Sequence, residues 1–76
     1  MPTVLRIHGF DVQIYTRDHE PPHVHCWKGN AELVIDLDPI SIRENNGMKK
    51  GDARQALAIM VAHQQFLLTE WNKVHP

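Results

Sequence analysis

The segment that decides how this chain folds is His19-Glu20-Pro21-Pro22-His23-Val24-His25. Its first five residues match the H-E-x-x-H pattern, in which a helix places two histidines on one face to bind zinc. Here both middle positions are prolines. Pro22 cannot donate a helical hydrogen bond, and its ring would clash with the preceding turn. Residues that precede a proline are also driven toward extended geometry. The segment therefore predicts a stiff, extended entry into a strand and excludes a zinc protease.

The chain on either side of this segment is patterned as strands first and helix afterwards. Phe10, Val12 and Ile14 alternate with polar residues, which is the period of a half-buried strand. Glycine, proline and asparagine interrupt the pattern at intervals that are typical of turns. The predicted strands cover residues 3–8, 10–14, 23–27 and 32–37, with a short fifth strand around residues 40–42.

From about Lys50 the apolar residues recur at steps of three and four, which predicts helix as far as Val74. A straight helix of this length would measure about 37 Å at ~1.5 Å per residue. Strands of about seven residues cover only ~23 Å. We therefore expect a bend or break near residues 63–65, the alternative being a straight helix whose end packs on a second subunit. The predicted fold is an α+β domain, with a small antiparallel sheet of four to five strands packed on a C-terminal helix or bent helix pair.

Composition limits the class of protein. At 76 residues the chain is predicted to form a single domain, residues 1–76, with a modest core. A formal net charge of −1 provides no global attraction to nucleic acid or to anionic membranes. The single cysteine excludes an internal disulfide framework and fits a reducing compartment. With no predicted signal peptide or membrane span, we expect a cytoplasmic protein that does not act at a membrane.

Strand alternation assigns the side chains of the third predicted strand to two faces. His23, His25 and Trp27 point to one side, and Val24 and Cys26 to the other. The small apolar pair suits the core beneath the helix. Both imidazoles are therefore expected to project away from the packed interior, and Cys26 is expected to be a buried small hydrophobe without a nucleophilic role.

Three interpretations of the histidine face stay open. It forms a solvated or interface surface, or it binds zinc or another divalent transition metal, or it performs acid–base chemistry without a metal. In the last case His23 and His25 share the roles of acid and base on RNA or another phosphate-bearing substrate. The metal interpretation takes His23 and His25 as ligands, because a metal site requires three or four of them. Its third ligand would be His19, or else Asp18, Asp36 or Glu32.

Basic residues gather around the start of the predicted helix. Arg43, Lys49, Lys50 and Arg54 lie close to backbone donors there and could receive a phosphate group. In the ribonuclease interpretation, Arg17 or Lys28 would stabilise phosphate charge beside the histidines. The competing interpretation is that these side chains are solvated and bind nothing.

Several motifs resemble those of one family of small bacterial proteins. They are Met1-Pro2-Thr3-Val4, Gly9, Tyr15, the Asp18–His25 block, Leu37-Asp38-Pro39, Asn46-Gly47, Leu67-Leu68 and Trp71-Asn72. The family is the one catalogued as domain of unknown function 4160, and the resemblance covers essentially the whole chain. His19, Pro21, Pro22, His23 and His25 match the family block.

The resemblance implies a context. Members of the family are often encoded beside a second small protein, and their size and gene arrangement are similar to those of toxin–antitoxin pairs. The resemblance therefore implies that this protein is a component of a toxin–antitoxin-like module. Its histidine strand would contact RNA or the small protein from the adjacent gene. Such a component is either a metal-independent ribonuclease-type toxin without a cofactor, or a metal-binding or purely protein-binding module without catalysis. A homodimer is compatible with either.

Overall fold

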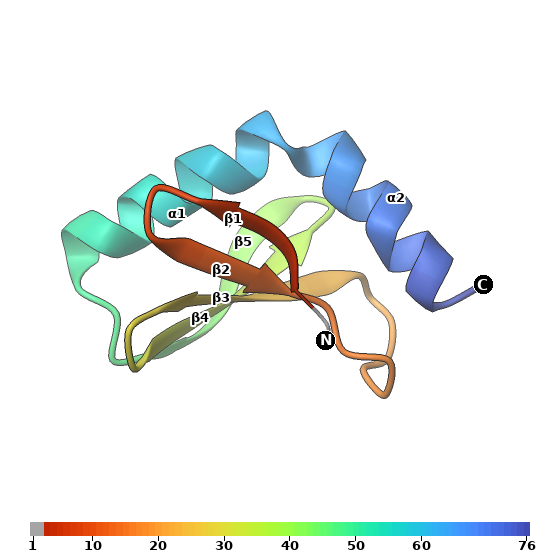
Figure 1. The fold of residues 1–76 in the computed structure, drawn as a ribbon, viewed down its shortest axis with the longest axis horizontal. Coiled ribbons are helices and arrows are strands. Elements are labelled where there is room, and N and C mark those ends of the chain that lie inside the picture. The colour runs from red at the N-terminus through yellow and green to blue at the C-terminus, as the bar shows by residue number, and fades with distance from the viewer. Residues whose placement is uncertain (1–2) are drawn as a thin grey trace.

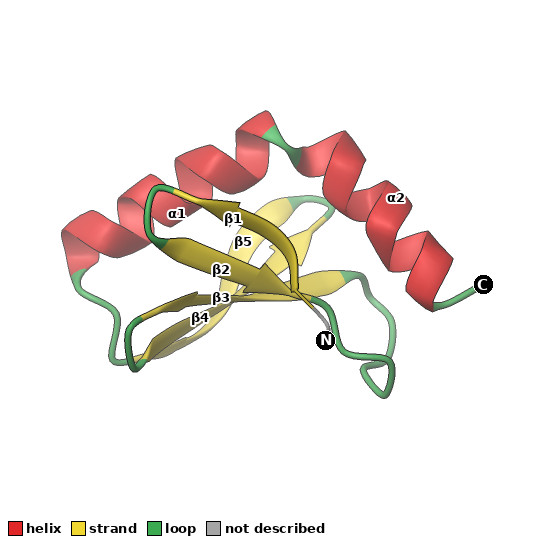
Figure 2. Ribbon diagram, viewed as in Figure 1, coloured by secondary structure: helices red, strands yellow, loops and turns green. Residues whose placement is uncertain are grey.

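The computed structural model describes residues 3–76 as a five-stranded sheet followed by two helices (Figure 1). Met1 and Pro2, which open the family-like motifs, lie outside the described residues. The strands pair antiparallel in chain order. Their bounds are β1 (Thr3–Ile7), β2 (Phe10–Gln13), β3 (His23–Lys28), β4 (Ala31–Leu37) and β5 (Ile40–Asn46). The helices α1 (Lys50–Ala62) and α2 (Gln64–Val74) lie along one side of the sheet (Figure 2). The α+β prediction is confirmed.

The first hairpin shows how local sequence determines the strand order. His8 and Gly9 connect β1 to β2, with φ angles of 51° and 82°. Two consecutive residues with positive φ form the tight turn whose twist matches that of paired strands. Glycine adopts such a φ angle without steric cost, and histidine tolerates it better than most side chains do. The hairpin aligns Ile7 with Phe10 and starts the meander.

The core lies between the sheet and the two helices. Alternate side chains of β2, β3 and β4 enter it, as the period-2 pattern predicts. The small residues Ala53 and Ala56 allow α1 to approach the sheet closely, and Met48 closes the end of the core beneath the β5–α1 turn. The sheet residues of the core are Phe10, Val12, Ile14, Val24, Cys26, Leu33, Ile35 and Leu37, and the helices add Ala53, Ala56, Ile59, Met60, Leu67 and Trp71.

The predicted helix break is confirmed at His63. Its backbone leaves helical geometry with φ −115° and ψ 17°, and its N–H donates to the carbonyl groups of both Ile59 and Met60. Gln64 is a polar residue in an otherwise apolar helical stripe, and it is the first residue of the second helix. Its Nε2 donates to the Leu37 carbonyl oxygen at 2.7 Å, which ties α2 to the end of β4. Neither helix within residues 3–76 has the length and apolar character that crossing a bilayer requires.

Residues 19–25 are not helical, as the prolines predict, but the chain bends at Glu20 and Pro21 before it becomes extended. It enters β3 at His23, and the peptide bond between Glu20 and Pro21 is cis. The carbonyl of Pro22 accepts a hydrogen bond of 3.0 Å from the Leu37 N–H, so the segment is fixed to the end of the sheet. This loop between β2 and β3 lies beneath the last turns of α2 (Figure 1).

Candidate functional site

Two histidines of β3 point to the same side of the strand, as its alternation predicts. The ring centroids of His23 and His25 are 5.5 Å apart, and the ring of Tyr15 lies 4.4 Å from that of His25. The expectation that both imidazoles project away from the interior is wrong for His23. Its side chain is only 6% exposed, because the indole of Trp71 from α2 covers it with ring centroids 5.3 Å apart. His25 is partly exposed.

Asp18, from the loop that precedes the prolines, joins these two histidines. Its Oδ2 lies 3.1 Å from His23 Nε2 and 2.8 Å from His25 Nε2. One ligand atom from each of the three residues falls within 4.8 Å of the other two, so they form a possible metal-binding group. His19 is exposed and is not a member of this group. Of the third residues that the sequence left open, Asp18 is the one that joins both histidines in this group.

The other nitrogen of each imidazole is fixed by an acceptor. His23 Nδ1 donates to the carbonyl oxygen of Pro21 at 3.0 Å. His25 Nδ1 donates to the Glu32 carboxylate at 2.8 Å. A carbonyl oxygen and an ionised carboxylate only accept hydrogen bonds, so each Nδ1 carries the hydrogen. In the neutral imidazole, Nε2 is then the atom with the free lone pair.

This arrangement directs two Nε2 atoms and one carboxylate oxygen toward a common point. Three electron-rich atoms at such distances repel one another unless positive charge lies between them. The charge is either that of protons on Nε2, which makes the trio an ion-pair network, or that of a metal ion. Ligands at ~2.1 Å from one ion lie ~3.0–3.4 Å apart in octahedral and tetrahedral geometries. The observed separations of 2.8 and 3.1 Å need only a small expansion to match.

Glu32 is itself held in place. Its Oε1 accepts a hydrogen bond of 2.9 Å from Asn46 Nδ2, while its Oε2 accepts from His25. The hydrogen-bonded series Asn46, Glu32, His25 thus runs across β5, β4 and β3. Carboxylates that orient a ligating imidazole in this way are the usual outer partners of metal-bound histidines.

A second contact joins the same loop to the C-terminal helix. Trp71 Nε1 donates to Glu20 Oε2 at 2.9 Å, and the imidazole of His75 stacks on the indole with centroids 3.9 Å apart. The buried indole therefore has an apolar surround, one hydrogen bond and the His23 ring as a neighbour. Trp71 is a core residue, as its position in the apolar stripe predicts.

The basic residues predicted to bind phosphate do not form one patch. Lys28 pairs with Asp52 at 3.1 Å, and Arg43 pairs with Asp36 at 2.6 Å. The loop after β2, which contains Arg17, lies at the opposite end of the sheet from the start of α1 (Figure 1). Lys49, Lys50 and Arg54 are exposed at the start of α1. Two of the six cations are thus occupied by carboxylates of this chain.

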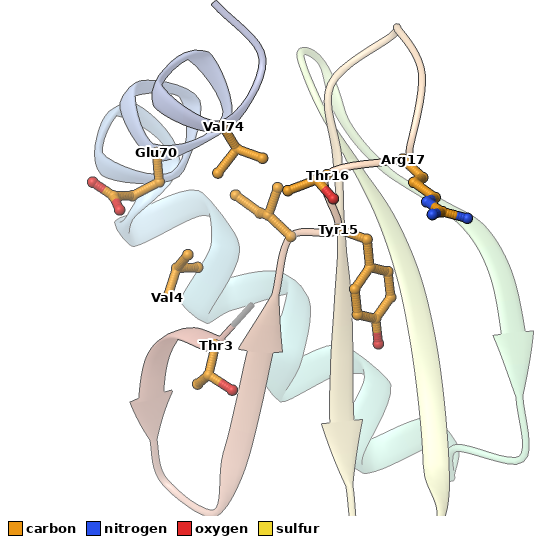
Figure 3. A pocket seen from close by; sticks show the side chains of 8 residues that line it. Thr3, Val4, Tyr15, Thr16, Arg17, Glu70 and Val74 are labelled. Atoms are coloured by element: carbon orange, nitrogen blue, oxygen red, sulfur yellow. The ribbon is translucent and has the colours of Figure 1, made fainter. Parts of the chain in front are cut away.

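A groove of about 640 Å³ lies beside the metal-binding group, between the start of β1, the end of β2 and α2 (Figure 3). Val4 and Val74 contribute apolar surface to it, and Arg17 and Glu70 lie at opposite ends. Tyr15 lines the groove and also contacts His25. The tyrosine therefore separates the groove from the two histidines.

Cys26 is buried, as strand alternation predicts. Burial raises the pKa of its thiol from 9.0 to about 12, and the nearby Asp11 carboxylate adds to the increase. We expect the native protein to resist iodoacetamide at pH 8 and the urea-unfolded protein to react at once, as followed by mass spectrometry. Because the folded-state pKa is the higher one, this thiol favours folding below pH 9 and that contribution is lost as the pH rises toward 12. Rapid alkylation of the native chain would contradict this assignment.

Sequence reasoning named His23, His25 and two further members of the site as alternatives, but it missed how they are held. Asp18 and Glu32 each lie seven residues from His25, in opposite directions along the chain. Glu32 was predicted as a possible ligand, and it is instead the acceptor for His25 Nδ1. No sequence pattern indicated that the Pro21 carbonyl would fix His23, or that Glu20 would bind Trp71.

The comparisons with known proteins concern the family alone. The family described as "Domain of unknown function (DUF4160)" matches residues 9–72 of the 76-residue chain. No curated protein and no solved structure matches the chain. The matched region contains β2 to β5, both helices up to Asn72, and all the residues of the metal-binding group. The chain therefore belongs to the DUF4160 family.

Proposed function

We propose that this protein binds a divalent transition metal through Asp18, His23 and His25. The observation that supports the proposal is the fixed orientation of both imidazoles. Each Nδ1 is held by an acceptor, so both Nε2 atoms face the Asp18 carboxylate, and an ion that takes the place of the Nε2 protons would meet two imidazoles and one carboxylate oxygen. Two imidazoles and one carboxylate suit Zn²⁺, Fe²⁺, Co²⁺ or Ni²⁺ rather than the oxygen-preferring Mg²⁺ and Ca²⁺.

Three protein ligands leave a coordination position for water or another small molecule, which is the composition of catalytic rather than structural zinc sites. The opening lies on the side of Asp18 and His25, since His23 is covered by Trp71. When bound, the metal would supply Lewis-acid chemistry. The chain's own residues orient the ligands and restrict water on the His23 side.

The ribonuclease-type interpretation of the same histidines has less support. Both nitrogens of His25 are taken by carboxylates, and His23 is almost fully covered. A general acid or base must reach the proton that it transfers. The toxin–antitoxin context stays a prediction. Its test is growth of cells that express wild type or His23→Ala/His25→Ala, each with and without the neighbouring gene.

The direct test is metal analysis of protein purified without a histidine tag, followed by calorimetric titration of the metal-free protein with Zn²⁺. We expect one ion per chain. A ligand that binds only the folded state raises the free energy of unfolding by about 2.7 kcal/mol at 100 times its Kd. Thermal unfolding with and without Zn²⁺ gives this shift independently. If none of Zn²⁺, Fe²⁺, Co²⁺ and Ni²⁺ binds or stabilises the protein, the trio is an ion-pair network and the proposal is refuted.

Glu32→Gln provides a second prediction. The amide keeps the shape of the side chain but removes the charge that orients His25, and the loss of such outer partners costs about 10–100-fold in metal affinity. We expect Zn²⁺ binding to weaken by about tenfold or more. The matched control is Glu44→Gln on the exposed strand β5, which should bind Zn²⁺ like wild type. Equal affinities for the two variants would show that Glu32 does not support the site.

A further inference from the structure

A surface outside the metal-binding group combines an open sheet edge with an apolar groove. Within residues 3–76, strand β5 pairs with β4 only, and residues 41–46 are exposed. Between β5 and α1 lies a groove of about 370 Å³, whose apolar floor includes Met48, Leu57 and Ile42. Ile42 is 45% exposed, which is unusual for a large apolar side chain on the helix-facing side of a sheet.

The same surface continues along α1. Lys50, Arg54, Leu57 and Val61 follow one another at steps of four, three and four, so they lie on one stripe of the helix. Val61 is 62% exposed. The stripe therefore has two cations near its start and two apolar side chains farther along, and Lys50, Arg54 and Leu57 line the groove beside β5.

The cations of this surface have no counterion within the described part of the chain. Lys28, Arg43 and Lys73 each pair with a carboxylate, but no ion pair within residues 3–76 includes Lys49, Lys50 or Arg54. Asp52 is engaged by Lys28. Glu44 pairs with Val34 across a register shift, whereas Ile42 pairs with the core residue Ile35, so the shift separates Glu44 from the groove face. In a chain of net charge −1, this local positive charge lacks an internal partner.

We propose that this surface, defined by Ile42, Lys50, Arg54, Leu57 and Val61, binds an extended acidic segment of a partner protein. Open strand edges beside an apolar groove receive peptides by adding a strand, where main-chain bonds supply affinity and side-chain pockets supply specificity. Here the pockets select apolar side chains for the groove and carboxylates for Lys50 and Arg54. The register shift near Arg43 restricts strand pairing to one side of that residue.

The positive charge of this surface distinguishes between the partners that could bind to it. A second copy of this chain would bring the same unpaired cations to the interface, whereas an acidic segment neutralises them. An RNA strand would also neutralise them, but it gains nothing from the exposed apolar residues Ile42 and Val61. The combination of cations and apolar surface therefore favours an acidic polypeptide.

The test uses two fluorescein-labelled capped peptides, one alternating glutamate with valine and the other alternating lysine with valine. Fluorescence anisotropy with the full chain is expected to show saturable binding of the acidic peptide only. Lys50→Glu/Arg54→Glu should weaken that binding by about tenfold, since two favourable charge pairs become repulsive. Ile42→Asn should weaken it by about fivefold through lost apolar contact. Raised salt should weaken the binding further.

Lys73→Glu, a charge reversal on α2, is the matched control and should bind the acidic peptide like wild type. All variants should keep the wild-type far-ultraviolet circular dichroism and Zn²⁺ affinity, which separates this proposal from the metal site. The proposal is overturned if the acidic peptide does not bind, if both peptides bind equally, or if the double reversal has no effect. A dimer in sedimentation equilibrium that Ile42→Asn dissociates would also overturn it, because a second copy would then occupy the surface.

Discussion

Replacing His25 with alanine is expected to weaken Zn²⁺ binding by more than about 100-fold, beyond the loss that removal of an outer partner causes. The substitution deletes one of the three ligands and leaves Glu32 without the Nδ1 donor that it accepts from. Calorimetric titration of the metal-free protein measures the change. The thermal stabilisation by Zn²⁺ should disappear with it.

His19→Ala is the matched control for this experiment. His19 belongs to the same histidine cluster in the sequence, but it is exposed and lies outside the group that Asp18 forms with His23 and His25. We expect its Zn²⁺ affinity to stay within about twofold of wild type, because exposed side chains away from the ligands contribute little. If loss of His19 weakens binding as much as loss of His25 does, the ion has a different ligand set.

Replacing Trp71 with alanine is expected to destabilise the fold by about 3–5 kcal/mol, as for other buried aromatic residues. The indole is fully buried, contacts His23 and His75, and donates to Glu20. A chain of this size has a total stability of about 4–11 kcal/mol. Equilibrium unfolding in urea, followed by far-ultraviolet circular dichroism, should therefore show a large fall in the midpoint or a chain that is mostly unfolded.

Two variants separate the contributions of Trp71. Trp71→Phe keeps most of the buried apolar surface and loses the bond to Glu20, so we expect a loss of about 1–2 kcal/mol. Phe66→Ala removes another aromatic side chain of α2 that is 44% exposed, and its cost should be below about 1 kcal/mol. A midpoint for Trp71→Ala as high as that for Phe66→Ala would show that α2 does not need this anchor.

Much of the fold follows from periodicities that are visible in the sequence. The alternation from Phe10 to Ile14 and the helical steps after Lys50 each report a local geometry, which is why the first four strands and the helix start agree with the structure. The fifth strand was predicted too short, because β5 continues past residues 40–42 to Asn46. The break at His63 was predicted from length, because a straight helix would have outrun the sheet. The bond from Gln64 to the Leu37 carbonyl, which ties α2 to the sheet just after the break, joins residues 27 apart, and no local pattern contains it.

Strand alternation predicted one property of the site, the face of the sheet on which each side chain lies. Alternation tells which face a side chain takes, and it placed His23 and His25 together. It carries no information about what covers that face, so the burial of His23 under Trp71 was not anticipated. The position of Asp18 depends on the path of the β2–β3 loop, which the prolines stiffen but do not direct. That path requires tertiary contacts such as the bond from Leu37 to the Pro22 carbonyl.

The β2–β3 loop carries three contacts within four residues. Asp18 faces both imidazoles, Glu20 accepts from the Trp71 indole, and the Pro21 carbonyl orients His23. An ion held by Asp18 and the anchoring of α2 therefore draw on the same short stretch of backbone, and each event favours the loop conformation that the other needs. Thermodynamic linkage makes this effect reciprocal. An ion whose binding stabilises the docked position of α2 also binds more tightly when α2 is docked. For the proposed site, we therefore expect a substitution that loosens the docking of the C-terminal helix to weaken metal affinity as well.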